Sequence, residues 1–183
     1  MSTDANTRNF IQQMNHARQI RQYHEDQVPE DLLNELLQIA RWTGSSRNTQ
    51  PWHFVVVTDK EKLRQLSELR TPINWVAGAP LGVAIVLDGT GGDASEAYDE
   101  GRLTERIMIG TRILGLGAGV AWFLDEDKEA EAKRILGVPA ERTLRQVIAI
   151  GYPVTSKDPR PNPARAGRKP LSEIVNYNSM RQS

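Results

Sequence analysis

The pattern of apolar and polar positions divides the chain into helix-type and strand-type segments. Apolar residues recur at helical spacing in five segments, which we predict to be helices: 10–17, 29–40, 58–69, 100–115 and 127–136. Four shorter segments rich in β-branched or other apolar residues are predicted to be strands: 53–57, 82–88, 120–124 and 144–152. The last of these is nearly continuous in apolar residues, which indicates a central strand.

Local signals predict where two of the helices begin and where loops lie. Pro29 is expected at the first helical position of its helix, and Thr58 with Glu61 fits a capping box that would begin the next one. Polar or glycine-rich segments are expected to be loops or breaks between elements: 43–52, 89–93 and 115–119.

The composition changes after residue 155. Residues 156–183 hold four of the ten prolines, and six basic side chains against two acidic ones. Proline-rich chain is extended and forms no core of its own, yet the apolar residues Leu171, Ile174 and Val175 need burial. Either an extended arm wraps around another subunit, or a loop packs on its own domain. We therefore predict one domain over 1–155, with 156–183 as its C-terminal arm.

Overall composition narrows the function classes. The chain has 183 residues, 39% of them hydrophobic, which suits one globular domain. Basic and acidic residues balance at 23 each, whereas a nucleic-acid-binding chain is usually basic. Cysteine is absent, which excludes disulfides and a cysteine nucleophile. The longest apolar run, 76–87, is short of the roughly 20 residues that span a bilayer, so we expect a soluble cytoplasmic protein without a membrane partner.

Several common catalytic patterns are missing from the sequence. The three histidines, His16, His24 and His53, do not have the spacing of metal ligands, so no metal site is expected. The glycines at 115–119 follow a predicted helix, which is the wrong context for a dinucleotide-binding turn. Those at 89–92 lack the lysine of a phosphate-binding loop, so a plain loop is favoured there.

Two features remain that could bind a ligand. The 43–52 loop offers short uncharged donors and acceptors suited to the edge of a planar heteroaromatic ligand, although a hydrogen-bonded turn is the simpler interpretation. Arginines occur near both ends of the chain, and an arginine can bind phosphate through two parallel hydrogen bonds. Arg18, Arg21, Arg168 and Lys169 could together hold a phosphomonoester, or they could be solvated surface charges.

Taken together, these motifs resemble the FMN-dependent nitroreductase family. The resemblance runs in order from about residue 16 to 177 and is most specific in the block Asn48-Thr49-Gln50-Pro51-Trp52. It also includes Arg18-Gln19-Ile20-Arg21, Leu114-Gly115-Leu116-Gly117, Gly151-Tyr152-Pro153 and Arg168-Lys169-Pro170-Leu171.

The resemblance implies an FMN site built from three segments and the arm. Arg18, Gln19 and Arg21 would bind the phosphate and ribityl chain, although the family's usual Arg-Arg-Ser is Ala17-Arg18-Gln19 here. The loop that meets the flavin from the partner subunit carries Ser45, Ser46, Asn48 and Gln50, with Gly44 in place of the family's proline. The segment from Gly119 to Trp122 would lie beside the ring near N5, and Arg168 would bind the phosphate.

The resemblance also implies a fold and an activity. The expected fold is α+β, with a central, mainly antiparallel sheet flanked by helices in an interlocked homodimer with swapped C-terminal arms. The expected enzyme uses NAD(P)H to reduce nitroaromatics, quinones or a related small acceptor by a ping-pong mechanism, with no catalytic side chain. The short region 89–105 predicts an open pocket lined by Tyr98 and Arg102. Alternatives are specialised flavin chemistry (flavin-consuming, dehalogenating or dehydrogenating) and a non-enzymatic flavin-binding protein.

Overall fold

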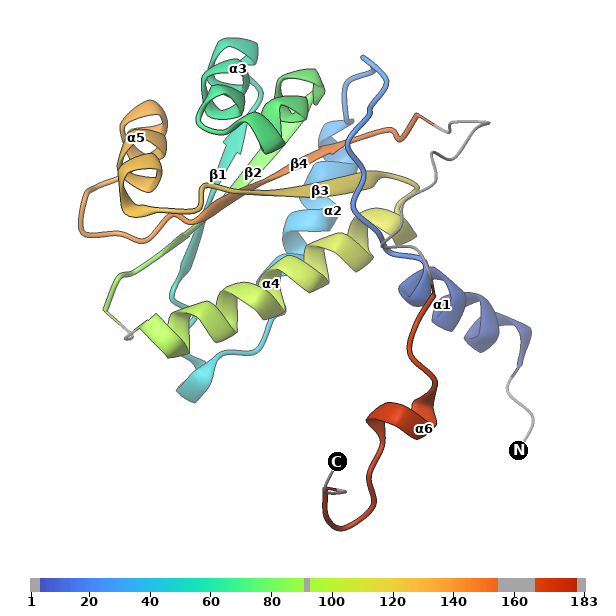
Figure 1. Cartoon of the computed structure of the whole chain (residues 1–183). Coiled ribbons are helices and arrows are strands. Elements are labelled where there is room, and N and C mark those ends of the chain that lie inside the picture. The colour runs from blue at the N-terminus through green and yellow to red at the C-terminus, as the bar shows by residue number, and fades with distance from the viewer. Residues whose placement is uncertain (1–3, 91–92, 155–166, 181–183) are drawn as a thin grey trace.

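The chain folds around one four-stranded antiparallel sheet (Figure 1), in a computed structural model that describes residues 4–90, 93–154 and 167–180. The strands are β1 (Trp52–Val57), β2 (Leu81–Leu87), β3 (Gly117–Trp122) and β4 (Gln146–Gly151). Their order in the sheet is β1-β2-β4-β3. β4 is central and buried along its whole length, which confirms the prediction for segment 144–152.

Helices cover both faces of the sheet (Figure 1). One face carries α3 (Lys60–Glu68), the 3₁₀ segment η2 (Thr71–Gly78) and α5 (Glu126–Leu136), and the other carries α2 (Glu30–Arg41) and α4 (Asp93–Ile113). Because side chains alternate between the faces of a strand, β4 sends Val147 and Ala149 into one core cluster and Ile148 and Ile150 into the other. The α+β fold with a flanked antiparallel sheet is confirmed.

Two helix starts differ from the sequence prediction. Pro29 is the residue before α2, with extended backbone angles, and not its first helical residue. Asp59, and not Thr58, caps α3: its Oδ1 accepts hydrogen bonds from the backbone N–H groups of Glu61 at 2.8 Å and Lys62 at 3.3 Å. The carboxylate of Asp59 thereby pairs N–H groups that have no partner within the helix, as an N-cap residue does.

The helix and the strand that follow the glycine-rich segments begin earlier than the sequence predicts. α4 begins at Asp93, so much of the region 89–105 is helical; residues 91 and 92 lie outside the described part. Gly115 has a positive φ of 76°, which turns the chain after α4, and β3 begins at Gly117, earlier than predicted. The 3₁₀ segment η2 was not predicted, because its apolar residues lack helical periodicity.

The two chain ends lie outside the sheet and its covering helices (Figure 1). α1 (Ala5–Asn15) packs beside α4 and buries none of its residues fully. Of the predicted arm, residues 167–180 are described; they contain the short helix α6 (Leu171–Ile174) and are exposed throughout. Leu171 is 72% and Ile174 57% exposed in the single chain. Within the described ranges, no helix is long and apolar enough to cross a membrane.

Candidate functional site

The segment after α1 runs along the free edge of β3. Gln19 pairs with Ala118 in a parallel bridge, and the backbone N–H of Ile20 donates a 2.8 Å hydrogen bond to the carbonyl of Ala118. Further on, Tyr23 forms a bridge with Pro153, so the segment crosses from β3 to the end of β4. The arginine-rich sequence is therefore fixed against the sheet.

Gln19 connects this segment to the predicted flavin-contacting stretch. Its side-chain oxygen accepts a 2.7 Å hydrogen bond from the backbone N–H of Val120. β3 is an edge strand, and an edge strand presents backbone groups that lack a strand partner. The structure thus brings together Gln19 and the stretch from Gly119 to Trp122, which lie about a hundred residues apart in the sequence.

Gly119 is at the tightest point of this contact. A Cβ atom added there would lie 2.2 Å from the carbonyl oxygen of Ile20 and 2.7 Å from the ring of Trp75. Both distances are below normal van der Waals separation, so a glycine is required if the segment is to lie this close.

Trp75 and Arg70, which the sequence did not predict as site residues, also contact the 18–21 segment and the end of β3. The guanidinium of Arg21 lies 5.9 Å from the centroid of the Trp75 ring, within the range of a cation–π contact. Arg70 Nη1 donates a 2.5 Å hydrogen bond to the carbonyl of Trp122. Both come from or adjoin η2, and the element was not recognised in the sequence. A tryptophan inside a short proline-led segment was the available signal.

The 18–21 segment keeps its positive charge at the surface. Arg18 and Arg21 are exposed, whereas Tyr23 is half-buried, with its hydroxyl oxygen 2.6 Å from the carbonyl of Ile20 and 3.0 Å from that of Ala149. Burial raises the pKa of Tyr23, so its phenol stays neutral. Arg168 is exposed near the start of the described part of the arm. Its predicted role at the phosphate stays a prediction.

The second predicted group lies in a separate loop between α2 and β1. It contains the 3₁₀ turn η1 (Ser46–Asn48), and the hydroxyl of Ser45 accepts a 2.9 Å hydrogen bond from the backbone N–H of Gln50. Asn48 and Gln50 have positive φ values of 57° and 49°. The hydrogen-bonded turn is therefore present, and Ser46, Asn48 and Gln50 remain exposed for a ligand.

These two groups of predicted residues are far apart in one chain. The loop lies beside the first half of α4, where Gly44 approaches Arg102, whereas the 18–21 segment lies beside β3, which follows the end of α4 (Figure 1). The prediction that the loop meets the flavin of a partner subunit stays a prediction.

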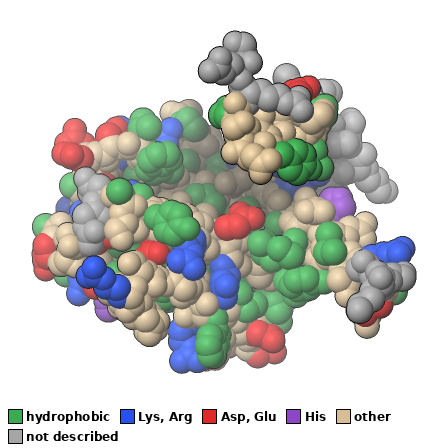
Figure 2. Space-filling view, turned by 90° about the horizontal axis from the view of Figure 1, so that it is seen from below, with side chains coloured by type: hydrophobic (Ala, Val, Ile, Leu, Met, Phe, Trp, Pro, Cys, Tyr) green, Lys and Arg blue, Asp and Glu red, His purple; other side chains and the backbone are tan. Residues whose placement is uncertain are grey.

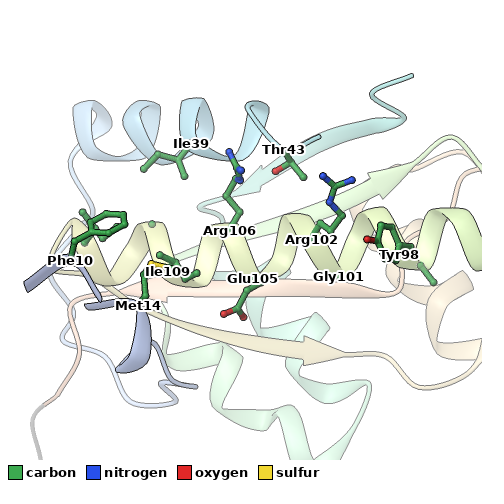
Figure 3. Close-up of a pocket in the computed structure, with 13 residues that line it drawn as sticks. Phe10, Met14, Ile39, Thr43, Tyr98, Gly101, Arg102, Glu105, Arg106 and Ile109 are labelled. Atoms are coloured by element: carbon green, nitrogen blue, oxygen red, sulfur yellow. The ribbon is translucent and has the colours of Figure 1, made fainter. Parts of the chain in front are cut away.

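A cavity of about 830 Å³ follows α4 between these regions. Figure 3 shows Phe10, Met14 and Ile109 at one end, and Tyr98 and Arg102 at the other. Tyr98 and Arg102 thus line a cavity, as predicted. Figure 2 shows hydrophobic side chains on the surrounding face, where Phe10 is 53% and Ile113 44% exposed.

A buried carboxylate lies in the first half of α4. Glu100 Oε2 accepts a 3.1 Å hydrogen bond from Arg145, and Glu100 Oε1 is buried without a hydrogen-bond partner. Burial raises the pKa of Glu100, and Arg145 opposes that rise. Arg145 also lines a separate cavity of about 600 Å³ next to Trp122.

Comparisons with known proteins identify the family of the chain. The model of the nitroreductase family matches residues 15–84, which include the 18–21 segment and the 45–50 loop. A protein of Archaeoglobus fulgidus, assigned by inference as NADH dehydrogenase/NAD(P)H nitroreductase, is 30% identical over 149 residues, or 77% of this chain and 83% of that protein.

One solved structure and one more distant relative are also informative. An FMN-dependent nitroreductase from Clostridium difficile R20291 superposes with a TM-score of 0.80 at 27% identity, covering 93% of this chain and 99% of that chain. Human iodotyrosine deiodinase 1 is 25% identical over an alignment of 198 positions that covers 91% of this chain and 67% of that protein.

Proposed function

The chain belongs to the nitroreductase family, and on that premise we propose that it is an oxidoreductase that binds FMN and takes electrons from NAD(P)H. The observation that carries this proposal is the contact between two distant segments. Gln19 of the arginine-rich segment meets the backbone of Val120 at the free edge of β3. The family resemblance implies that both segments bind the same cofactor.

The residues gathered at this edge fit FMN chemically. Arg18 and Arg21 offer exposed guanidinium groups, which match a phosphate in charge and in hydrogen-bond geometry. Gln19 offers a polar amide for the ribityl hydroxyls, and it stands where the family's serine is expected. The exposed Ser46 and Asn48 of a second subunit would supply uncharged donors and acceptors to the ring edge.

In this proposal the protein binds and positions, while the cofactor carries the redox chemistry. FMN, when bound, supplies two-electron transfer from NAD(P)H to an acceptor. The chain's arginines hold the phosphate and contribute positive potential. Gly119 lets the 18–21 segment lie close to the strand, so that the edge of β3 has a fixed shape. NAD(P)H and the acceptor would bind in turn at the same face of the flavin, in ping-pong order. We expect the protein to work in the cytoplasm, where NAD(P)H is available.

We propose a homodimer, in which the 45–50 loop of one chain would face the 18–21 segment of the other, because the two groups lie beside different elements of the single chain. The apolar end of the cavity along α4 is a suitable contact surface, since Phe10, Met14 and Ile113 are each more than 40% exposed in the single chain. Exposed patches of this kind mark interaction sites. The exposed Leu171 and Ile174 of the arm would find burial on the partner subunit.

The acceptor class that we propose is small aromatic: nitroaromatic compounds, quinones or related molecules. The cavity along α4 is large enough for such a molecule, and Tyr98 offers an aromatic ring for stacking. Reductive dehalogenation of a small aromatic is the second candidate, favoured by the similarity to human iodotyrosine deiodinase 1 over most of this chain.

An absorbance experiment tests the proposal. The purified chain is incubated with FMN, desalted, and treated anaerobically with NADPH or NADH. Retained flavin bands that bleach, and that return on addition of menadione or nitrofurazone, would support the proposed reductase. Return of the bands with 3-iodotyrosine alone would favour the dehalogenating candidate. Protein that retains no flavin would overturn the assignment of FMN.

A further inference from the structure

The predicted flavin loop begins at Gly44. The space that a side chain at this position would fill is occupied by the guanidinium of Arg102. A Cβ atom added at Gly44 would lie 2.6 Å from Nη2 of Arg102. The family pattern has proline at this position, whose ring would meet the same guanidinium. The glycine in this chain therefore admits Arg102 from α4 to the base of the 45–50 loop.

Arg102 is anchored there but retains free donors. Its Nη1 lies 3.6 Å from Oδ1 of the buried Asp99, an ion pair longer than a hydrogen bond, and its guanidinium lies 5.6 Å from the ring centroid of Tyr98. Its side chain is 43% exposed. A guanidinium carries five N–H donors, so most of them remain available toward the cavity.

Arg102 has charged neighbours of both signs: Arg106 and Glu105 line the same cavity, and Asp99 forms an ion pair with Arg102. Arg106 Nη1 donates a 2.8 Å hydrogen bond to the carbonyl of Trp42. Figure 3 shows Arg102 and Arg106 extending toward α2, whereas Glu105 extends from the opposite side of α4. Arg41 lies over the Trp42 ring, at 5.8 Å from its centroid.

A smaller cavity adjoins this cluster on the loop side. It measures about 390 Å³, and Arg41, Trp42, Gly44, Asn48 and Gln50 are among its lining residues. Two of them, Asn48 and Gln50, belong to the loop assigned to the flavin. A ligand at this end of the cavity along α4 would thus lie near the aromatic rings of Trp42 and Tyr98 and near arginine guanidinium groups.

We propose that Arg102 is a specificity-determining residue that binds the carboxylate of an anionic aromatic acceptor. This inference rests on the proposed function, because the 45–50 loop is what would bring Arg102 to the partner subunit's FMN. The planar fork of an arginine matches a carboxylate in two parallel hydrogen bonds, and the buried carboxylate of Asp99 attracts the guanidinium from one side. The acceptor's aromatic ring would stack on the flavin while its carboxylate pairs with Arg102.

A matched pair of acceptors tests this directly. 4-Nitrobenzoate and 4-nitrobenzamide have nearly the same shape and differ by one negative charge. We expect the ratio of their kcat/KM values, benzoate over benzamide, to fall about tenfold in Arg102→Gln, because the two charge-assisted hydrogen bonds are lost and partial exposure to water weakens their effect. Arg112→Gln is the control, since Arg112 is exposed on the same helix and lies outside the residues that line either cavity.

Gly44→Ala provides an independent variant that keeps the charge. Its methyl group would push the flexible end of Arg102 out of the space that it occupies. We expect the same ratio to fall in this variant, by less than in Arg102→Gln. An unchanged ratio in both variants would overturn the proposal.

Two further readouts separate this inference from the proposed function. Titration calorimetry of the FMN-treated protein measures binding of both probes without turnover, and selective weakening of 4-nitrobenzoate in Arg102→Gln is expected even if neither compound is reduced. Absence of reduction with that binding pattern would refute the reductase assignment alone. If Arg102→Gln instead weakens NADPH relative to NADH and leaves the acceptor ratio unchanged, Arg102 recognises the nucleotide's phosphate and the acceptor proposal is wrong.

Discussion

The substitution Gly119→Ala tests the contact that defines the candidate site. The added methyl would lie 2.2 Å from the carbonyl oxygen of Ile20 and 2.7 Å from the Trp75 ring. The first neighbour is backbone and the second is a ring packed against the core, so neither yields easily. The 18–21 segment must therefore move away from β3.

The expected cost follows from what that movement breaks. The segment loses the hydrogen bond from Ile20 to Ala118 and the one between Val120 and Gln19. Two hydrogen bonds contribute about 2 kcal/mol together, and overpacking adds about 1–3 kcal/mol. A destabilisation of about 3–5 kcal/mol lowers the unfolding temperature by roughly 6–20 °C in a chain of this length.

Thermal unfolding monitored by circular dichroism measures this shift, and FMN retention after desalting measures the site. Gly78→Ala is the matched control, because a Cβ there meets nothing within 4 Å and the change should leave the unfolding temperature unchanged or slightly higher. We expect Gly119→Ala to lose both stability and flavin. An unfolding temperature within 2 °C of wild type, with flavin retained, would refute the packing of the segment on β3.

Three other predictions address the helix cap, the buried carboxylate and the dimer. Asp59→Ala should destabilise the protein by about 1 kcal/mol, and Thr58→Ala by much less, in urea unfolding; equal losses would restore Thr58 as the cap. Burial raises the pKa of Glu100, so the folded protein binds the carboxyl proton more tightly than the unfolded chain does. The protonated form of Glu100 therefore favours folding, and this stability is lost as pH rises through the raised pKa. Wild type should therefore lose unfolding temperature relative to Glu100→Gln as pH rises above the ordinary glutamate pKa of about 4 and through the raised pKa, and a constant difference would contradict this. Phe10→Asp with Ile113→Asp should convert a dimer into monomers that retain less FMN, by light scattering after size exclusion; a wild-type monomer that retains FMN would refute the dimer.

The fold could be predicted from the sequence to a large extent. The apolar periodicity located the helices and strands because each element must bury one face, and both faces in the case of β4. Helix starts were less accurate, since Asp59 and Thr58 are both good capping residues and the geometry of the turn selects between them. η2 was missed because a 3₁₀ segment leaves no periodic pattern of apolar residues.

For the candidate site, the sequence predicted the separate motifs but not the contacts between them. Local residue order identified the arginine-rich segment, the polar loop and the stretch after the glycines as separate motifs. That Gln19 meets Val120 depends on the path of the chain across the sheet edge, which short-range sequence patterns do not encode. Trp75 and Arg70 carry no motif, so they were found through their contacts.

The sequence by itself therefore determined the elements, the fold class and the types of side chain that could hold a flavin phosphate. Those properties depend on neighbours three or four positions apart, or on residue chemistry alone. The tertiary structure decided that Gly119 accommodates the N-terminal segment and that Gly44 accommodates Arg102. The close approach at the buried Gly119 is set by packing in three dimensions, because interiors are dense enough that a single added methyl group has no room.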